Sequence, residues 1–405
     1  MKIIVSHQGK QHLNALLLGL EKFNVLTRFY TGFAFQKIKT PQYLPEKWSK
    51  KLQKRHFINI PVDKIIHFPF IFFMTKWIKT EIGHVKMPYK WFDSWVAKRL
   101  KKDYYDILIG YENHNLLSFK EAKRAGKITV LDLAGVHHDF QTPVLMAVGA
   151  YSEDTQIEYI SERKEQALEY TDYMLVVSKF AEKTVVDAGF PADRVYIKYH
   201  GFNQAVFKPK PTYNTEGALN IYFVGTMGRR KGIPFLIDVF KGLIKKGLDI
   251  RLTLIGPIDD FEVAHLDLPN YTYLPFLTHQ ELLKIHHELD LFVFPTNIDS
   301  WAQVVVEAMA CGSPVLVSEN TGAKDAVEQG GGMILPICDE KAWSDAIEKF
   351  YFDRTLLKKL GEESVAVAAQ YTVVGYHQQV FNIMADIYQR EKYKTERNYK
   401  VLKTA

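Results

Sequence analysis

The stretch Leu219–Lys246, LNIYFVGTMGRRKGIPFLIDVFKGLIKK, decides the fold class. A short apolar run (219–224) leads into a loop bounded by glycines (225–232), and a longer run (233–246) follows in which apolar residues recur with the helical period. The first pattern predicts a buried strand and the last an amphipathic helix. A strand, a glycine loop and a helix in this order are the unit from which parallel α/β sheets are built.

The same alternation continues on both sides of this stretch. We expect further strands at 2–6, 107–110, 128–133, 174–177, 195–198, 250–255, 271–274, 291–294, 314–317 and 333–335. We expect further helices at 13–20, 119–125, 160–169, 280–289, 304–310, 323–328, 340–353 and 354–370. Strands and helices that alternate at this spacing predict parallel, doubly wound sheets.

A break in the pattern divides the chain. The segment Phe207–Thr212, FKPKPT, has two prolines in a charged, non-periodic stretch and is typical of a linker. We therefore predict two α/β domains, 1–206 and 207–370. Ligands of such sheets bind outside the carboxyl ends of the strands. With two sheets facing each other, the cleft between the domains is the expected site.

Composition limits the class of protein. With 405 residues, 47% hydrophobic and 24% charged, the chain has enough apolar material for two cores. Its two cysteines, Cys311 and Cys338, exclude a disulfide scaffold and have no metal-ligand spacing. The N-terminus has too few apolar residues for a signal peptide, and no run is long enough for a transmembrane helix. We therefore expect a cytoplasmic protein.

The net charge of +6 is unevenly distributed. The segment 37–102 contains 16 Lys/Arg and 4 Asp/Glu, and many aromatic residues lie among them. Basic residues mixed with aromatics suit an anionic membrane surface, in which case the protein would sit on the inner face of the cytoplasmic membrane. The other interpretation is a solvated basic face with the aromatics in the core. We expect no nucleic-acid partner, because no nucleic-acid motif accompanies the charge.

The strongest chemical signal is the stretch Asp299–Val315, DSWAQVVVEAMACGSPV. A strand ends before it, a loop carries the carboxylate of Asp299, and a helix begins near Gln303. The first turn of that helix offers unpaired N–H groups and a positive dipole end, which suit a phosphate. Glu307 lies about one turn further on, placed to accept hydrogen bonds from sugar or ribose hydroxyls. The alternative is an ordinary loop and helix with acids by chance.

This string resembles the donor-site motif of the retaining glycosyltransferases of family 4, the group 1 enzymes with the GT-B fold. That motif is Glu, seven residues, Glu, then Ala-Met-Ala-X-Gly-X-Pro-Val, and here the two acids are Asp299 and Glu307. The resemblance implies two facing Rossmann-like domains with the active site in the cleft between them. It also implies that the first acid faces the donor sugar and the second binds the ribose. Asp299 is one methylene shorter than the usual residue.

Further positions support the resemblance. The string from Phe223 to Gly232 looks like the diphosphate loop of the family, in which Lys231 matches a lysine. Thr226 stands where the family has an arginine, and Arg229 or Arg230 is the candidate to replace it. An exposed basic turn is the alternative. The resemblance implies these donor-binding residues: Gly9, Gly225, Arg229, Arg230, Lys231, Pro275, Phe276, Leu277, Ser300, Trp301, Ala302, Gln303, Val304 and Glu307.

The first domain would supply the acceptor side. His137 and His138 follow an expected strand, and in the family a histidine near this position often lies close to the transferred sugar. Glu112 follows the strand before and is a second acceptor candidate. Two surface histidines and a chance acid are the alternative. The residues expected to take part in catalysis are Asp299, Glu307, Lys231, His138 and His137.

The resemblance also implies the reaction. We expect transfer from a UDP- or GDP-activated sugar to a glycolipid, lipopolysaccharide or polysaccharide-type acceptor by front-face attack, with the nucleotide sugar as substrate and no separate cofactor. No Asp-X-Asp sequence stands out, so we expect no metal at the site. A helix at 371–395 should cross back to the first domain. The alternatives are another enzyme on this fold, such as an epimerase or phosphorylase, and a catalytically impaired nucleotide-sugar or lipid binder.

Overall fold

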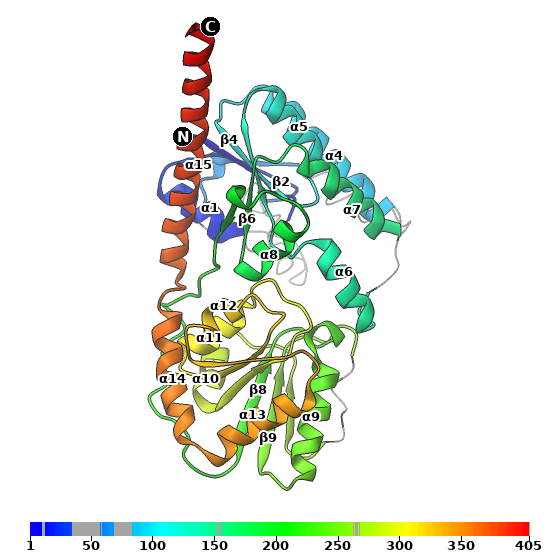
Figure 1. Cartoon of the computed structure of the whole chain (residues 1–405), viewed down its shortest axis with the longest axis vertical. Coiled ribbons are helices and arrows are strands. Elements are labelled where there is room, and N and C mark those ends of the chain that lie inside the picture. The colour runs from blue at the N-terminus through cyan, green and yellow to red at the C-terminus, as the bar shows by residue number, and fades with distance from the viewer. Residues whose placement is uncertain are drawn as a thin grey trace, which may run out of the picture.

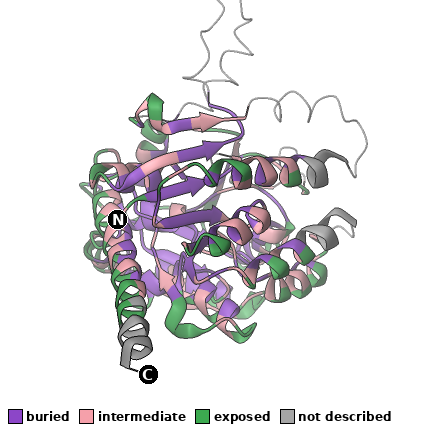
Figure 2. Cartoon of the chain, turned by 90° about the horizontal axis from the view of Figure 1, so that it is seen from above, coloured by how far each residue is buried: buried purple, intermediate pink, exposed green. Residues whose placement is uncertain are grey.

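The chain folds into two α/β domains, one above the other in Figure 1. The computed structural model describes residues 1–9, 13–34, 57, 59–68, 83–151, 155–261, 263, 266 and 268–404. Each domain contains one sheet, and all the described strand pairs are parallel. Figure 2 shows strands that are largely buried beneath helices whose outer faces are exposed. The predicted doubly wound architecture is confirmed.

The first sheet has seven strands in the order β3-β2-β1-β4-β5-β6-β7. They are β1 (Ile3–Ser6), β2 (Leu26–Thr31), β3 (Ile65–His67), β4 (Ile107–Tyr111), β5 (Ile128–Asp132), β6 (Tyr173–Val176) and β7 (Val195–Ile197). The helices that accompany this sheet are α1 (Leu13–Lys22), α4 (Gly83–Leu100), α5 (Leu116–Arg124), α6 (His138–Ala147), α7 (Thr155–Leu168) and α8 (Lys179–Asp187).

The second sheet has six strands in the order β10-β9-β8-β11-β12-β13. They are β8 (Leu219–Val224), β9 (Ile250–Ile255), β10 (Tyr271–Leu274), β11 (Leu291–Phe294), β12 (Val315–Ser318) and β13 (Gly332–Leu335). Its helices are α9 (Ile233–Lys245), α10 (His279–Glu288), α11 (Gln303–Ala310), α12 (Lys324–Val327), α13 (Glu340–Phe352) and α14 (Thr355–Ala368). The opening stretch thus forms β8, a glycine loop and α9, as its pattern predicts.

Strands β2 and β3 and helices α4, α6 and α8 were not predicted from the sequence. Strand β2 carries Arg28 in its centre, where it interrupts the apolar run, and this guanidinium pairs with Asp103 at 2.9 Å. Helices α4 and α6 each contain a proline, Pro88 and Pro143. Charged or proline residues inside an element weaken the periodicity from which the element is recognised.

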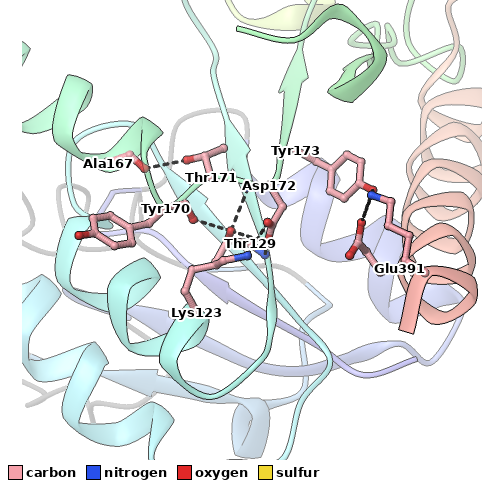
Figure 3. A network of polar contacts seen from close by, with 9 residues as sticks. Lys123, Thr129, Ala167, Tyr170, Thr171, Asp172, Tyr173 and Glu391 are labelled. Carbon is pink, nitrogen blue, oxygen red and sulfur yellow. Dashed lines mark hydrogen bonds and ion pairs between the residues drawn. The ribbon is translucent and has the colours of Figure 1, made fainter. Parts of the chain in front are cut away.

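A long helix, α15 (Val373–Thr404), returns from the second domain and runs along the first, beside α1 in Figure 1. Tyr376, Val380, Ile383, Met384 and Ile387 repeat at helical spacing and share a buried cluster with the apolar face of α1. Beyond this cluster, Tyr173 Oη donates a hydrogen bond of 2.6 Å to Glu391 Oε1 of α15 (Figure 3).

The two connections between the domains lie side by side. Phe202 N donates to Tyr371 O at 2.8 Å, and Val373 N donates to Phe202 O at 3.0 Å. A side chain at Gly201 would place its Cβ 2.2 Å from the Thr372 carbonyl group, so only glycine allows this approach. The two segments that connect the domains therefore run next to each other with their backbones in contact.

About half of the basic segment 37–102 lies outside the described residues. Of its aromatic residues that are described, Phe57 and Phe92 are buried, and Trp95 stacks on Phe68 with ring centroids 5.1 Å apart. For these residues the core interpretation holds, whereas contact of the segment with a membrane stays a prediction. Within the described ranges, none of the helices combines the length and apolarity that crossing a bilayer requires.

Candidate active site

The centre of the second sheet determines where this site lies. Strand β8 is flanked by β9 on one side and by β11 on the other, so the strand order reverses at β8. Ligands of open α/β sheets bind outside the carboxyl ends of the strands at such a point. The loops that follow β8 and β11 border a cavity of about 290 Å³ there. It is lined by Ala134, Val177, His200, Val224, Gly225, Thr226, Arg230, Lys231, Phe294, Asp299, Ser300, Trp301, Ala302, Gln303 and Val304.

Lys231 is positioned by a short 3-10 turn, η4 (Arg229–Lys231), that links the β8 loop to α9. Its Nζ forms an ion pair with Asp299 Oδ2 and lies 4.9 Å from the centroid of the Phe294 ring. Burial lowers the pKa of Lys231, and the carboxylate of Asp299 opposes that shift. A buried cation thus lies beside a carboxylate at the switch point, the place where the strand order reverses at β8.

Gly232 ends the turn that holds Lys231, with a left-handed φ of 70°. A Cβ at this position would lie 2.0 Å from Pro295 O. We therefore expect Gly232→Ala to lower the free energy of unfolding by about 3 kcal/mol or more, through backbone strain and the clash together. Gly247, at the other end of α9, has a φ of 82° and no atom within 4 Å of such a Cβ.

Gly247→Ala is therefore the matched control for this substitution. Strain in the left-handed region alone should lower its free energy of unfolding by about 1 kcal/mol. Urea denaturation of the two variants measures both values. Equal losses would contradict the packing that we assign to Gly232.

The segment Asp299–Ala302, which we call the donor loop, is shaped by the side chain of Asp299. Its Oδ1 accepts hydrogen bonds from Trp301 N at 3.0 Å and from Ala302 N at 2.7 Å. Burial would raise the pKa of Asp299, but the charge and hydrogen bond of Lys231 and the Trp301 N–H group keep this pKa below its ordinary value. Both carboxylate oxygens of Asp299 are therefore bonded to groups of the protein in this conformation.

Helix α11 begins directly after the donor loop. Ala302 precedes it with a φ of 61°, and no side chain caps the helix. The first turn lines the cavity through Gln303 and Val304, and first-turn N–H groups have no partner inside a helix. One turn further, Glu307 is buried and accepts a hydrogen bond from Gln303 Nε2 at 3.1 Å. Burial raises the pKa of Glu307 to about 7.

The two arginines of the β8 loop have different surroundings. Arg230 lines the cavity and donates from Nη1 to Ile298 O at 3.3 Å. Arg229 is exposed, does not line the cavity, and is bonded to Asp260 through its N–H and its guanidinium. Thr226 lines the cavity but has no charge. Of the two candidates to replace the missing arginine, Arg230 is therefore the better placed.

Six of the donor-binding candidates do not line the cavity: Arg229 and Glu307, which are described above, and four others. Pro275, Phe276 and Leu277 lie between β10 and α10, and the Phe276 side chain is 76% exposed. Gly9 lies in the first domain after β1, where its N–H donates to His7 Nδ1 at 2.8 Å. Their contact with a nucleotide stays a prediction.

The acceptor candidates form a separate group. His137 and His138 stack with ring centroids 4.4 Å apart, and their Nε2 atoms lie 3.5 and 3.2 Å from Glu165 Oε1. Glu112 pairs with Lys164. These residues border a small cavity of about 20 Å³, and none of them lines the larger one.

This separation has a local cause. His137 caps the N-terminus of α6 by accepting from Asp139 N, and its Nε2 and that of His138 lie beside Glu165 of α7. In the described part of the chain, His137, His138 and Glu165 are the one group spaced closely enough to hold a metal ion, and this group lies outside the larger cavity. The expectation that donor transfer needs no metal stays a prediction.

Three residues of the first domain that line the larger cavity were not among the candidates. Ala134, Val177 and His200 follow β5, β6 and β7 within one to three residues. Phe294, the last residue of β11, was missed as well. All four lie at the carboxyl ends of parallel strands, so the rule that places ligands at that edge of a sheet could have identified them.

Comparison with known proteins finds a family match for the second domain. The sequence model of the family described as glycosyl transferases group 1 matches residues 207–366. This match covers most of the second domain and less than half of the whole chain. CapM of Staphylococcus aureus, a capsular polysaccharide biosynthesis glycosyltransferase, is 32% identical to this chain over 149 residues, which are 35% of this chain and 39% of CapM. The chain spans about half or less of the length of the curated relatives it matches.

Solved structures match nearly the whole of this chain. Sucrose-phosphate synthase from Thermosynechococcus elongatus superposes with a TM-score of 0.65 at 16% identity, over 96% of this chain and 100% of that one. The Anabaena protein HepE in complex with UDP-glucose gives 0.63 at 16% identity, over 95% and 100%. At such identities the likeness shows the fold, which is GT-B, as the sequence predicts.

Proposed function

We propose that this protein is a retaining glycosyltransferase that transfers a sugar from a UDP- or GDP-activated donor to a carbohydrate or glycolipid acceptor. One observation carries the proposal. The Lys231–Asp299 pair and the first turn of α11 meet at one cavity at the switch point of the second sheet. Glu307 lies one turn further along α11, is buried outside the cavity lining and is bonded to Gln303, which lines the cavity. A cation, a helix N-terminus and a carboxylate acceptor are the groups that a nucleoside diphosphate needs.

The charges suggest how the reaction would proceed. As the bond from the sugar carbon to the diphosphate breaks, negative charge develops on the leaving oxygen. Lys231 and Arg230, together with the N–H groups of α11, would stabilise that charge without reorganising. The acceptor hydroxyl would attack from the side on which the diphosphate leaves and pass its proton to the departing diphosphate. Catalysis would then rest on positioning and electrostatics.

Known relatives support the choice of substrates. HepE, which shares the fold, has been solved with UDP-glucose, and this makes UDP the first donor base to test. CapM takes its name from capsular polysaccharide biosynthesis, which favours a growing polysaccharide or its lipid-linked precursor as acceptor. Under this proposal the enzyme acts at the inner face of the cytoplasmic membrane, where such precursors are made.

Thermal unfolding with nucleoside diphosphates tests the donor site. Because a ligand stabilises a protein according to its concentration relative to Kd, UDP or GDP at 100 times Kd should add about 2.7 kcal/mol to the free energy of unfolding. ADP and uridine serve as controls for base and phosphate recognition. A protein that UDP, GDP and their sugar derivatives all fail to stabilise would contradict the proposal.

Two further outcomes separate the finer parts of the proposal. Binding of a sugar nucleotide without release of the diphosphate, even with added acceptors, would favour the catalytically impaired binder. Where a product forms, the configuration of its anomeric proton by NMR shows whether stereochemistry is retained.

A further inference from the structure

Ser178 in the first domain is bonded to the donor loop of the second. It is the N-cap of α8, is fully buried, and accepts a hydrogen bond from Ala181 N at 3.0 Å. The same hydroxyl donates to Ser300 O at 2.6 Å. Ser178 does not line the cavity, although its neighbour Val177 does. Its hydroxyl therefore acts on the donor site only through the backbone of the donor loop.

The donor loop depends on the first domain at two more points. Ser300 Oγ donates to Ala134 O at 2.7 Å, and Trp301 Nε1 donates to His200 O at 3.0 Å. The loop ends at Ala302 with a left-handed φ of 61°, which residues other than glycine rarely adopt. Such a conformation persists only where its surroundings fix it. Apart from Asp299 within the loop itself, much of that support comes from the opposite domain.

The contact around Ser178 is closely fitted. A Cβ on Gly322 would lie 1.9 Å from Ser300 O and 2.5 Å from Ser178 Oγ, so a glycine is required there. Three residues further on, Asp325 Oδ2 accepts a hydrogen bond from Lys179 N at 2.6 Å. The N-terminus of α8 is thus bonded to the second domain through two consecutive residues, one on the donor loop and one on α12.

We propose that Ser178 is a positioning residue for the donor: by fixing the Ser300 carbonyl, it holds the donor loop in the conformation that presents Lys231 and the first turn of α11 to the diphosphate. The inference rests on the proposed nucleotide-sugar site. Under this proposal, donor binding and contact between the domains are thermodynamically linked. Because bonds from the first domain help to hold the donor loop in this shape, contact between the domains should strengthen donor binding, and a bound donor should strengthen the contact by the same factor.

The substitution Ser178→Ala tests this role. Loss of one buried hydrogen bond to the loop should weaken binding of UDP or GDP, measured by titration calorimetry at 15 °C, about tenfold. In turnover, the donor KM should rise by a similar factor while kcat at saturating donor changes much less. The variant also loses the cap of α8, so its thermal stability falls.

A matched control separates the cap from the contact with the donor loop. Asp339 caps α13 by accepting from Ala342 N at 2.9 Å and does not line the cavity. Asp339→Ala should lower thermal stability as Ser178→Ala does but leave nucleotide affinity unchanged. Ser300→Ala, which leaves α8 intact, provides a second variant. If both serines act on one loop, the double variant should bind no more weakly than about the weaker single one.

The outcomes are distinct. Wild-type affinity in Ser178→Ala, or a loss no greater than in Asp339→Ala, would overturn the positioning role while leaving the proposed function standing. Strictly additive losses in the double variant would also overturn it. If the wild-type protein binds neither UDP nor GDP, the proposed function fails, and this inference fails with it.

Discussion

Replacing Lys231 with alanine is expected to lower the rate of donor turnover by about 10²–10³-fold, the usual effect of removing one preorganised group that stabilises a developing anion. Lys231 is buried, lines the cavity and pairs with Asp299. Its loss would also leave Asp299 as a buried carboxylate without its cation, so we expect the free energy of unfolding to fall by about 3 kcal/mol. Diphosphate release and urea denaturation measure the two effects.

A second buried lysine shows whether lost stability explains lost turnover. Lys210 is buried outside the cavity, where Nζ donates to Leu289 O at 2.6 Å and burial lowers its pKa to about 8. Lys210→Met should lower stability, because the carbonyl loses its partner, but leave turnover per folded molecule unchanged. A Lys231→Ala variant that retains turnover within about threefold of wild type would show that Lys231 does not contribute to turnover at this site.

Replacing Glu307 with glutamine is expected to weaken nucleoside diphosphate binding by about 10–100-fold. A hydrogen bond to a charged group contributes about 1.5–3 kcal/mol, and the amide cannot replace the carboxylate as acceptor for both ribose hydroxyls. The substitution keeps the size of a side chain that is buried behind the first turn of α11. Calorimetric titration with UDP and GDP measures the loss, and affinity equal to wild type would show that Glu307 does not bind the ribose.

The pH dependence of Glu307 gives the same substitution a second readout. Burial raises the pKa of Glu307 from 4.5 to about 7 in the folded protein. The folded state therefore keeps a proton that the unfolded state loses between pH 4.5 and 7. Its contribution to stability is complete below pH 4.5 and is lost as pH rises through 7. Wild type should lose up to about 3 kcal/mol relative to Glu307→Gln between pH 5 and 8.

Nucleotide affinity should change in the opposite direction. The carboxylate is the form that accepts hydrogen bonds from hydroxyls, so wild-type affinity should rise between pH 6 and 8 more steeply than that of Glu307→Gln. The variant also corrects for titration of the diphosphate itself. Parallel pH profiles of the two proteins would contradict ionisation of Glu307 on binding.

Much of the fold could be predicted because most strands are short apolar runs between turns. The β8–α9 stretch is the clearest case, and its bounds match the structure within a residue. Strand β2 could not be found in this way, because Arg28 interrupts its pattern and is stabilised there by Asp103, which is distant in sequence. Tertiary contacts of this kind leave no periodic signal.

The site residues likewise divide into those that local motifs reveal and those that only tertiary contacts bring together. Lys231 and the stretch from Asp299 to Glu307 are local motifs; the structure brings Lys231 and Asp299–Val304 to one cavity, and Glu307 is bonded to Gln303 behind it. The acceptor histidines also follow a strand, but His137 caps α6 and both imidazoles lie beside Glu165 of α7. Ser178 and His200 reach the donor loop across more than 100 residues of sequence. Only the packing of the two domains reveals such contacts.

The most direct measurement is release of diphosphate from UDP- and GDP-sugars by the purified protein, followed by mass spectrometry with and without a glycan acceptor. The account predicts that wild type releases UDP or GDP from at least one sugar nucleotide and that Lys231→Ala is slower by about 10²–10³-fold. Absence of both binding and release across the panel would contradict it. Release that is equally fast in wild type and Lys231→Ala would contradict the assignment of Lys231 to the donor site.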